Sequence, residues 1–476
     1  MIQPSRRALA PILATIGAGL AAAAAAGSPP LPPRVEQVLH SQGLPSSAVS
    51  IVVRDAVTGE SYLELNAREP RSPASTIKVL TTFAALDQLG PSYQWTTRAY
   101  ATAPVVDGKL VGDLVIQGGG DPYLTAERWS RFARELRNTG LKRIEGDFVI
   151  DRSLYALQEP EADEFDGRGD RVYNVLPDAL LVNFQAVEFH FVPEATRVRV
   201  IVDPEPANLR LATAVRVANG PCGDGLKSLT FTTYENEPDR LALTGRIASH
   251  CPPPVARRAI MRAPDFAFGT FVSAWREQGG EFTGRLRLEP KPASARPLAE
   301  FESLSLAEVV RLLNKYSNNT MARMLLLTLA AERYGPPATV PNGERALAEW
   351  LYRQGLEFPD LVIDNGSGLS RRTRIAPDSM ARVLAAAYRS RYFPELAASL
   401  PLGGQDGTLR RRFADLAGEG RIRLKTGHLN GVSAVAGWVT SRSGRPLAVV
   451  VVVNHPGAEY RGQPVIDTIV RWALER

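Results

Sequence analysis

One short segment constrains this chain more than any other: Pro73-Ala74-Ser75-Thr76-Ile77-Lys78. It predicts a loop that runs into an apolar helix over residues 76–89, closed by Gly90. Near a helix start, a serine and a lysine three residues apart share one face, so the amine can approach the hydroxyl. The pair is therefore a candidate nucleophile and base. The alternative is a serine that caps the helix, followed by a lysine whose stem lies along apolar surface.

Lysine usage favours the catalytic interpretation of Ser75 and Lys78. Only seven of the 56 basic residues are lysines, so the chain uses arginine almost wherever a positive charge alone suffices. Arginine cannot release its proton, whereas a partly buried lysine can become neutral and act as a base. A lysine kept at position 78 therefore points to proton transfer.

The N-terminus predicts export. Arg6 and Arg7 precede an alanine-rich apolar run over residues 8–26. This pattern is typical of a secretory signal peptide, which we place at residues 1–26. A retained membrane anchor is the alternative, because the run is almost long enough to span a bilayer. We expect a periplasmic protein, at most peripheral to the membrane, whose mature chain has no membrane span.

The charge balance excludes one class of partner and favours another. Loss of the signal peptide removes two arginines and no acidic residue, so the formal net charge falls from +6 to +4. Such a small surplus without long basic runs argues against a nucleic-acid binder. It is compatible with an anionic substrate of the cell envelope.

The two cysteines, Cys222 and Cys251, predict a disulfide in an exported chain. His250 beside Cys251 raises the alternative of a metal site. Two thiols and one histidine fall short of a zinc ligand set, so we expect no metal. No motif calls for a cofactor.

Hydrophobic patterning predicts two α/β flanks around a β-rich middle. A β-rich block between helical flanks indicates inserted domains. We expect a first catalytic part over residues 27–95, an inserted region of two domains over residues 96–295, and a second catalytic part over residues 296–476. The predicted strands are 48–55, 61–66, 110–117, 143–151, 186–191, 197–202, 228–234, 241–247, 285–289, 421–425, 433–440 and 447–453. The predicted helices, besides the one after Ser75, are 34–43, 126–138, 265–278, 305–315, 320–334, 344–354, 378–390 and 464–476.

Two further stretches supply the residue types that an activated serine needs. Tyr316-Ser317-Asn318-Asn319 falls between two predicted helices, where helix capping is the alternative role. Lys425-Thr426-Gly427-His428 ends one predicted strand and precedes another, with a glycine where something must approach the backbone closely. By composition, Lys-Thr-Gly should occur by chance on the order of a few hundredths of a time in such a chain. Lys425 is therefore a second lysine that we predict to have a functional role.

Taken in order, Ser75-x-x-Lys78, Ser317-x-Asn319 and Lys425-Thr426-Gly427 are the motif set of penicillin-binding proteins and class A β-lactamases. Ser317 follows Ser75 by 242 residues, which is too long for a compact β-lactamase. The chain resembles the class C low-molecular-mass penicillin-binding proteins, the D-alanyl-D-alanine carboxypeptidase/endopeptidase family, whose members carry a β-rich insertion between the first two motifs. Further segments in the resemblance are Gly120-Asp121-Pro122, Asp364-Asn365-Gly366-Ser367-Gly368-Leu369-Ser370, Leu400-Pro401 and Asp406-Gly407-Thr408-Leu409.

The resemblance implies a fold and a reaction. The fold is α/β and multi-domain, a penicillin-binding/β-lactamase-like transpeptidase fold in which helices flank an antiparallel sheet that carries a β-rich insertion. Ser75 would attack the carbonyl between two D-alanines while Lys78 takes its proton, which gives an acyl-enzyme. Ser317 would relay a proton to the leaving amine. Asn319 would hold the substrate amide and the lysine.

The third motif would bind the substrate's end. Lys425 and Thr426 would draw in the terminal carboxylate, and the backbone N–H groups of Ser75 and His428 would hold the oxyanion. His428 stands where many family members have threonine or serine. The implied partners are peptidoglycan stem peptides as substrates and β-lactams as covalent inhibitors. The alternatives are a β-lactamase and a catalytically retired wall-binding module.

Overall fold

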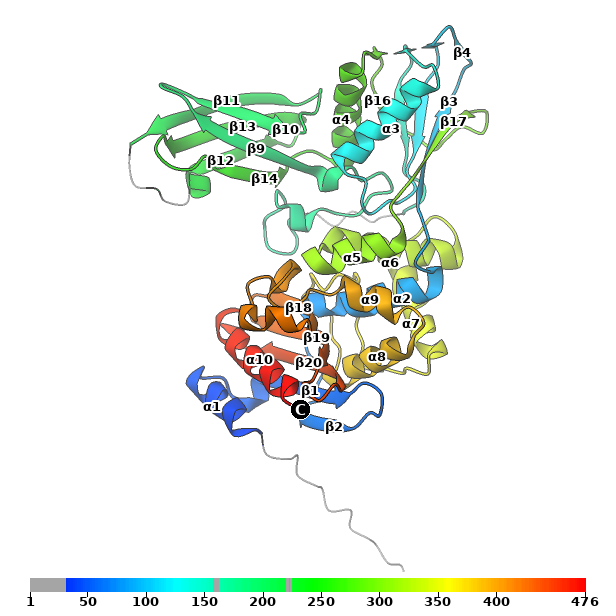
Figure 1. Cartoon of the computed structure of the whole chain (residues 1–476). Coiled ribbons are helices and arrows are strands. Elements are labelled where there is room, and N and C mark those ends of the chain that lie inside the picture. The colour runs from blue at the N-terminus through cyan, green and yellow to red at the C-terminus, as the bar shows by residue number, and fades with distance from the viewer. Residues whose placement is uncertain (1–30, 157–161, 220–221, 223–224) are drawn as a thin grey trace, which may run out of the picture.

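The computed structural model describes residues 31–156, 162–219, 222 and 225–476 (Figure 1). The predicted signal peptide at residues 1–26 lies outside this part of the chain. Within it, no helix combines the length and the apolar character that crossing a bilayer requires.

A five-stranded antiparallel sheet joins the beginning of the chain to its end. Strand β20 lies at its centre and is buried from Leu447 to Val453, so its residues pack on both faces. Valines alternate between the two sides, which gives the continuous apolar run that the sequence shows. The strands, in spatial order, are β18 (Ile422–Leu429), β19 (Val432–Thr440), β20 (Pro446–Asn454), β1 (Val49–Asp55) and β2 (Ser61–Leu65).

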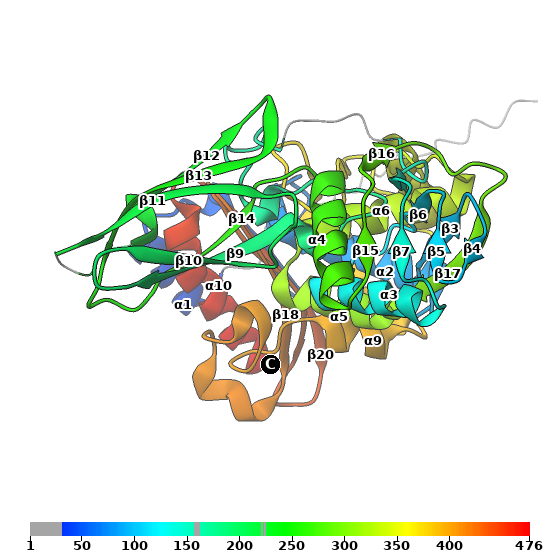
Figure 2. The same cartoon turned by 90° about the horizontal axis from the view of Figure 1, so that it is seen from above.

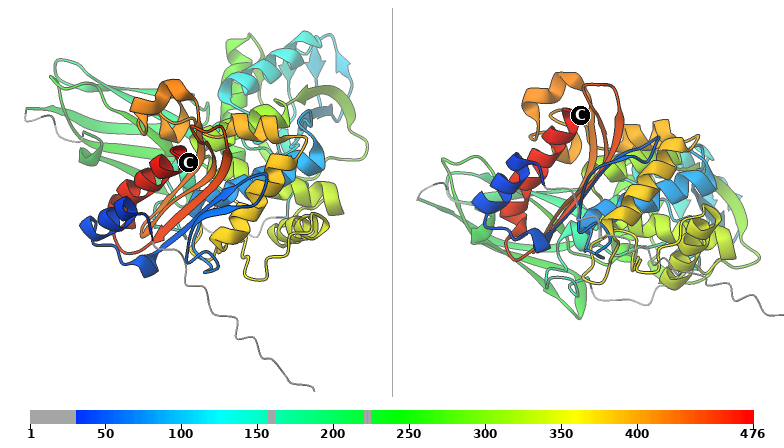
Figure 3. Two further views of the ribbon diagram at one scale, coloured as in Figure 1. Left: turned by 60° about the horizontal axis from the view of Figure 1, so that its bottom comes forward. Right: turned by 90° about the horizontal axis from the view of Figure 1, so that it is seen from below.

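Helices cover both faces of this sheet. On one face α10 (Ala458–Leu474) and α1 (Pro33–Ser41) lie side by side, as Figure 3 shows. On the other face α2 (Lys78–Leu89) is the central helix, with every residue from Lys78 to Leu86 buried. Around it pack α5 (Leu306–Tyr316), α6 (Asn319–Tyr334), α7 (Val340–Arg353), α8 (Pro377–Arg389) and α9 (Phe393–Ser399).

The last helix begins earlier than predicted. The sequence placed its start at Pro464, but α10 begins at Ala458 and contains the proline. A side chain at Gly462 would begin 2.8 Å from the Ser433 Cβ, so the first turns of α10 lie directly on β19. Tertiary packing therefore carries the helix across a residue that usually ends one.

Between β2 and α5 the chain forms two further layers of sheet. A four-stranded sheet has the order β15-β7-β5-β4, and a five-stranded one has the order β16-β8-β6-β3-β17, with α3 and α4 packed against them. The bounds are β3 (Thr96–Ala101), β4 (Val105–Val106), β5 (Lys109–Leu110), β6 (Leu114–Gln117), α3 (Ala126–Asn138), β7 (Arg143–Ile144), β8 (Phe148–Asp151), α4 (Ala263–Glu277), β15 (Glu281–Phe282), β16 (Leu286–Leu288) and β17 (Arg296–Glu302).

Glycines divide the strands that were predicted over residues 110–117 and 143–151. A side chain at Gly146 would begin 2.3 Å from the Gly112 carbonyl, and one at Gly284 would begin 2.0 Å from the Gly146 carbonyl. The three backbones therefore stack where β5, β7 and β15 pass into β6, β8 and β16. The predicted long strands are wrong because the chain turns from one sheet to the next at these glycines.

The remaining strands form a sandwich beside α4 (Figure 2). Its two sheets share one apolar core that includes Phe189, Phe191, Leu241 and Leu243. The predicted disulfide between Cys222 and Cys251 is confirmed, with a Cα–Cα distance of 5.6 Å, and it uses both thiols. One sheet has the order β10 (Val198–Asp203), β9 (Ala186–Pro193) and β14 (Val255–Ala259), and the other has β11 (Arg210–Ala218), β13 (Glu237–Ala248) and β12 (Leu229–Tyr234).

Candidate active site

A tight turn ahead of α2 carries the predicted nucleophile. Residues Ala74–Ile77 form a 3-10 turn, and the α-helix begins only at Lys78, two residues later than predicted. Ala74 has a φ of 46°, a conformation that residues other than glycine rarely adopt. Ser75 is partly exposed, whereas Lys78 is fully buried. The hydroxyl is accessible to a substrate while the amine beside it is shielded from water.

Three oxygen atoms surround the Lys78 amine. Its Nζ lies 2.8 Å from Ser75 Oγ and 2.8 Å from Asn319 Oδ1, and it also donates to the Ser367 carbonyl. Amide and carbonyl oxygens only accept hydrogen bonds, whereas a serine hydroxyl also donates. A neutral amine has two hydrogens, which the Asn319 and Ser367 oxygens take. Its lone pair is then left for the Ser75 hydroxyl, which is what a base for this serine needs.

The second motif lies between α5 and α6. Asn318, not Ser317, caps α6, because its side chain accepts a hydrogen bond from Met321 N at 2.9 Å. Ser317 follows α5 in a left-handed conformation with a φ of 59°. Asn319 Nδ2 donates to the Tyr173 carbonyl at 3.1 Å, which leaves Oδ1 turned to the lysine amine. The capping role therefore belongs to the residue between the two predicted site residues.

The third motif lies on β18. Lys425 is fully buried, and its Nζ lies 2.8 Å from Ser317 Oγ and 2.7 Å from the Thr426 carbonyl. The strand continues without interruption from Ile422 to Leu429, so the predicted strand end at this motif is wrong. The His428 side chain is exposed.

Gly427 is needed for close packing rather than for a strand end. A side chain at this position would begin 2.6 Å from the Pro73 carbonyl and 3.2 Å from the Ser75 amide nitrogen. The close approach that the sequence predicted is confirmed, and the approaching group is the serine turn itself. Strand β18 can thus place Lys425 and Thr426 beside the turn that carries Ser75.

Burial and like charges favour the neutral form of the Lys78 amine. Desolvation lowers the pKa of Lys78 well below its usual value, and the positive charges of Lys425 and Arg323 lower it further. Burial lowers the pKa of Lys425 to about 7. The site therefore combines an amine with a depressed pKa beside the serine with a second lysine that is close to half protonated near pH 7.

Sequence reasoning assigned no role to three groups at this site. The Ser367 and Tyr173 carbonyls orient Lys78 and Asn319, but backbone groups have no residue-type signature. The glycine-rich segment around Ser367 was the available signal, because a side chain at Gly368 would begin 2.0 Å from the Ala74 carbonyl. The third group is Arg323, four residues after Asn319 and thus on the same face of α6.

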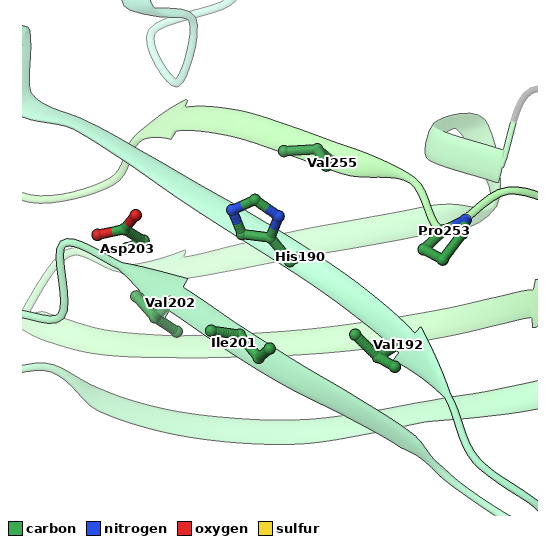
Figure 4. A pocket seen from close by; sticks show the side chains of 7 residues that line it. All are labelled: His190, Val192, Ile201, Val202, Asp203, Pro253 and Val255. Atoms are coloured by element: carbon green, nitrogen blue, oxygen red, sulfur yellow. The ribbon is translucent and has the colours of Figure 1, made fainter.

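A hollow of about 620 Å³ lies elsewhere, on the outer face of the β10-β9-β14 sheet (Figure 4). Its lining is mostly aliphatic and includes no serine, cysteine or lysine, so it pairs no nucleophile with a base. The lining residues are His190, Val192, Ile201, Val202, Asp203, Pro253 and Val255.

Comparison with known proteins identifies the family of this chain. Residues 31–475 match the D-Ala-D-Ala carboxypeptidase 3 (S13) family. The chain belongs to this family. The predicted resemblance to D-alanyl-D-alanine carboxypeptidases among the penicillin-binding proteins is thereby confirmed.

Relatives of the S13 chain match over most of its length. It is 30% identical over 439 residues to a D-alanyl-D-alanine carboxypeptidase from Actinomadura sp. (strain R39), covering 89% of this chain and 81% of the relative. It is 26% identical over 418 residues to the D-alanyl-D-alanine carboxypeptidase DacB from Haemophilus influenzae, covering 87% of each. The crystal structure of penicillin-binding protein 4 (dacB) from Haemophilus influenzae matches with a TM-score of 0.77 and 25% identity, covering 93% of this chain and 99% of that one. The predicted fold class is confirmed.

We predict that Gly427→Ala slows acylation of Ser75 by roughly 10- to 100-fold, because displacing a reacting group by about 1 Å can cost that much. The added methyl would meet the Pro73 carbonyl at 2.6 Å and push the serine turn away from β18. The rate of covalent labelling by a fluorescent penicillin measures the effect. Gly418→Ala is the matched control, since a side chain there meets nothing within 4 Å. Equal rates for both variants would contradict the tight contact.

Proposed function

We propose that this protein is a serine-type D-Ala-D-Ala carboxypeptidase that removes the terminal D-alanine of peptidoglycan stem peptides through an acyl-enzyme. The observation that carries the proposal is the buried, depressed-pKa amine of Lys78, 2.8 Å from the Ser75 hydroxyl. An unactivated serine is a weak nucleophile, and an adjacent base supplies the missing driving force. β-Lactams acylate the same serine and so inhibit the enzyme.

In the first step Ser75 attacks the carbonyl between the two D-alanines. Lys78 receives the hydroxyl proton on its lone pair, and Asn319 Oδ1 and the Ser367 carbonyl already accept its two hydrogens. The lysinium that forms keeps all of these oxygens as partners. Because they are in place beforehand, little reorganisation accompanies the proton transfer.

The tetrahedral intermediate needs donors for its oxyanion. We assign them to the backbone N–H groups of Ser75 and His428, on the two sides of the contact that Gly427 permits. A donor of this kind contributes roughly 3 kcal/mol to the transition state in other serine hydrolases. The intermediate then collapses as Ser317 passes a proton to the leaving amine. Water releases the acyl group by the reverse proton route.

Recognition of the substrate's end falls to Lys425 and Thr426. The Lys425 ammonium has three hydrogens, and the Ser317 hydroxyl and the Thr426 carbonyl accept two of them. The third is available for the terminal carboxylate, and Thr426, the next residue on β18, is partly exposed. A substrate that ends in a free carboxylate thus fits better than an internal amide.

We infer an exported, periplasmic enzyme from the N-terminal signal pattern together with the wall-peptide substrate. The same acyl-enzyme forms when the leaving amine belongs to a cross-linked neighbouring stem. Mass spectrometry of purified wall fragments, before and after incubation with the protein, identifies which amine leaves.

A labelled penicillin should attach covalently to the wild-type protein and not to Ser75→Ala. The reason is that no other nucleophile takes over once the hydroxyl is removed. Fluorescence of the denatured protein on a gel, with the adduct mapped by mass spectrometry, measures the attachment. Equal labelling of both proteins would contradict Ser75 as the nucleophile, whereas no labelling of either protein would favour the retired wall-binding module. Rapid hydrolysis of the label without a lasting adduct would favour a β-lactamase.

Lys78→Arg should reduce the acylation rate constant by at least about 100-fold, in the range that loss of a general base costs. The charge is kept, but arginine does not give up its proton at any usable pH. Stopped-flow measurement with a fluorescent penicillin separates this constant from the initial binding constant. An acylation rate near that of the wild type would show that Lys78 is not the base.

Binding of a carboxylate ligand should weaken as the pH rises through about 7. Burial lowers the pKa of Lys425 to about 7, so the free site loses its ammonium above that pH, and a carboxylate binds the charged form better. The dissociation constant of the initial penicillin complex should rise toward about tenfold per pH unit above pH 7. The penicillin methyl ester, which lacks the carboxylate, should show a flat profile. Parallel profiles would contradict the assignment of Lys425.

A further inference from the structure

A third buried lysine lies beside the site, and no step above uses it. Lys315 is the next-to-last residue of α5 and precedes Ser317 by two residues. Its ammonium donates to the Leu400 carbonyl at 2.6 Å and to the two carboxylate oxygens of Asp406 at 2.9 and 2.6 Å. All its hydrogens therefore have partners on one segment, residues 400–406. In an arginine-rich chain, a lysine is again kept at a buried position.

Asp406 folds that segment into a loop that rests on α5. Besides Lys315, its carboxylate accepts the Leu402 amide at 2.8 Å. The next residue, Gly407, has a φ of 53°, and a side chain there would begin 2.6 Å from the Lys315 carbonyl. The loop is therefore held to the last turn of α5 by a charged contact and by close backbone packing. This turn leads directly to Ser317.

The other side of the loop is bound to β18. The Leu424 amide donates to the Pro401 carbonyl at 3.1 Å, and the Gly403 amide donates to the Ile422 carbonyl at 2.9 Å. At the far end the Thr426 hydroxyl donates to Thr408 Oγ1 at 2.7 Å. One loop thus bridges the helix that ends at Ser317 and the strand that carries Thr426.

We propose that Lys315, Asp406 and Thr408 form a positioning link that sets the spacing between Ser317 and Thr426, with Thr408 tuning affinity for the substrate carboxylate. The inference rests on the proposed carboxypeptidase function and adds residues to it. When a carboxylate arrives, the Thr426 hydroxyl turns its hydrogen to the ligand, and the Thr408 hydroxyl donates to the oxygen of Thr426. Two hydroxyls in series polarise one another, which strengthens the bond to the anion.

In the Lys315–Asp406 pair the lysine is buried, whereas the aspartate side chain is 39% exposed, and a pair with a buried partner is a poor source of stability but a good source of geometry. Desolvation offsets most of its attraction, so apolar replacement of both partners is often neutral for folding, whereas removal of one partner strands a buried charge. This difference separates positioning from stability. If the pair only stabilises the fold, removal of both charges should restore acylation. If the pair sets geometry, acylation should stay low.

Thr408→Val tests the carboxylate end of the link. The variant keeps the shape of the side chain and loses the hydroxyl. We expect the dissociation constant of the initial penicillin complex to rise about fivefold to tenfold, with the acylation rate constant within about twofold and an unchanged melting temperature. The penicillin methyl ester should bind both proteins equally. Thr468→Val, which removes an exposed hydroxyl on α10, is the matched control. An unchanged dissociation constant for Thr408→Val would overturn the role of Thr408.

Asp406→Asn and Lys315→Met/Asp406→Leu test the ion pair. Asp406→Asn should lower the acylation rate constant divided by the dissociation constant at least about tenfold. The double variant should recover the melting temperature but not this ratio. Asp378→Asn, which breaks the partly buried pair with Arg54, is the control and should lower the melting temperature without changing acylation.

If the double variant recovered both its melting temperature and its ratio of acylation rate constant to dissociation constant, the positioning link would be overturned. Wild-type acylation in Asp406→Asn would overturn it too. Both results leave the proposed function intact, because the wild-type protein is labelled at Ser75 in each. A wild-type protein that no penicillin labels would instead overturn the proposed function, and this inference with it.

Discussion

The structure depends on keeping a lysine amine dry. Transfer of an unpaired ammonium into a protein interior costs several kcal/mol, so the fold around Lys78, which leaves it 0% exposed, favours the neutral form of its amine. The segments that exclude water are distant in sequence: α2 carries the amine, α6 supplies Asn319, and the loop at Ser367 closes a third side. Lys425, from the last strands, adds a like charge. Burial of this amine lowers the stability of the fold, and packing of the central sheet against α2 offsets that loss.

The insertion takes part in the same site. The Tyr173 carbonyl holds the Asn319 amide, and the Val175 carbonyl accepts the Thr320 hydroxyl at 3.0 Å. Two successive residues at the start of α6 are therefore bonded to a segment that arrives from the β-rich middle of the chain. The expected boundaries of that region, residues 96–295, stay a prediction.

The side chains of the site could be predicted from the sequence, whereas the backbone groups that orient them could not. Ser75, Lys78, Ser317, Asn319 and Lys425 could be found because residue type and spacing identify them, and the structure brings them to one place. The carbonyls at Ser367 and Tyr173 could not be found, because every residue has a carbonyl. The sequence marked Gly427 as a point of close approach, whereas it placed Gly112 and Gly146 inside predicted strands. At Gly427 the glycine admits a neighbouring turn to an unbroken strand, whereas at Gly112 and Gly146 it marks where a predicted strand divides. Only tertiary packing separates these cases.

The clamp on Asn319 has a consequence for how such a chain can change. Its amide has one end on the catalytic amine and the other on a main-chain oxygen of the insertion. Rotation of that amide by half a turn would put an NH2 group against the lysine and take away an acceptor. A descendant that lost the insertion would keep every motif residue and still lack the atom that fixes this orientation. Loss of the middle segment would remove the Asn319 Nδ2 partner, so the orientation of this side chain would then depend on its hydrogen bond with Lys78.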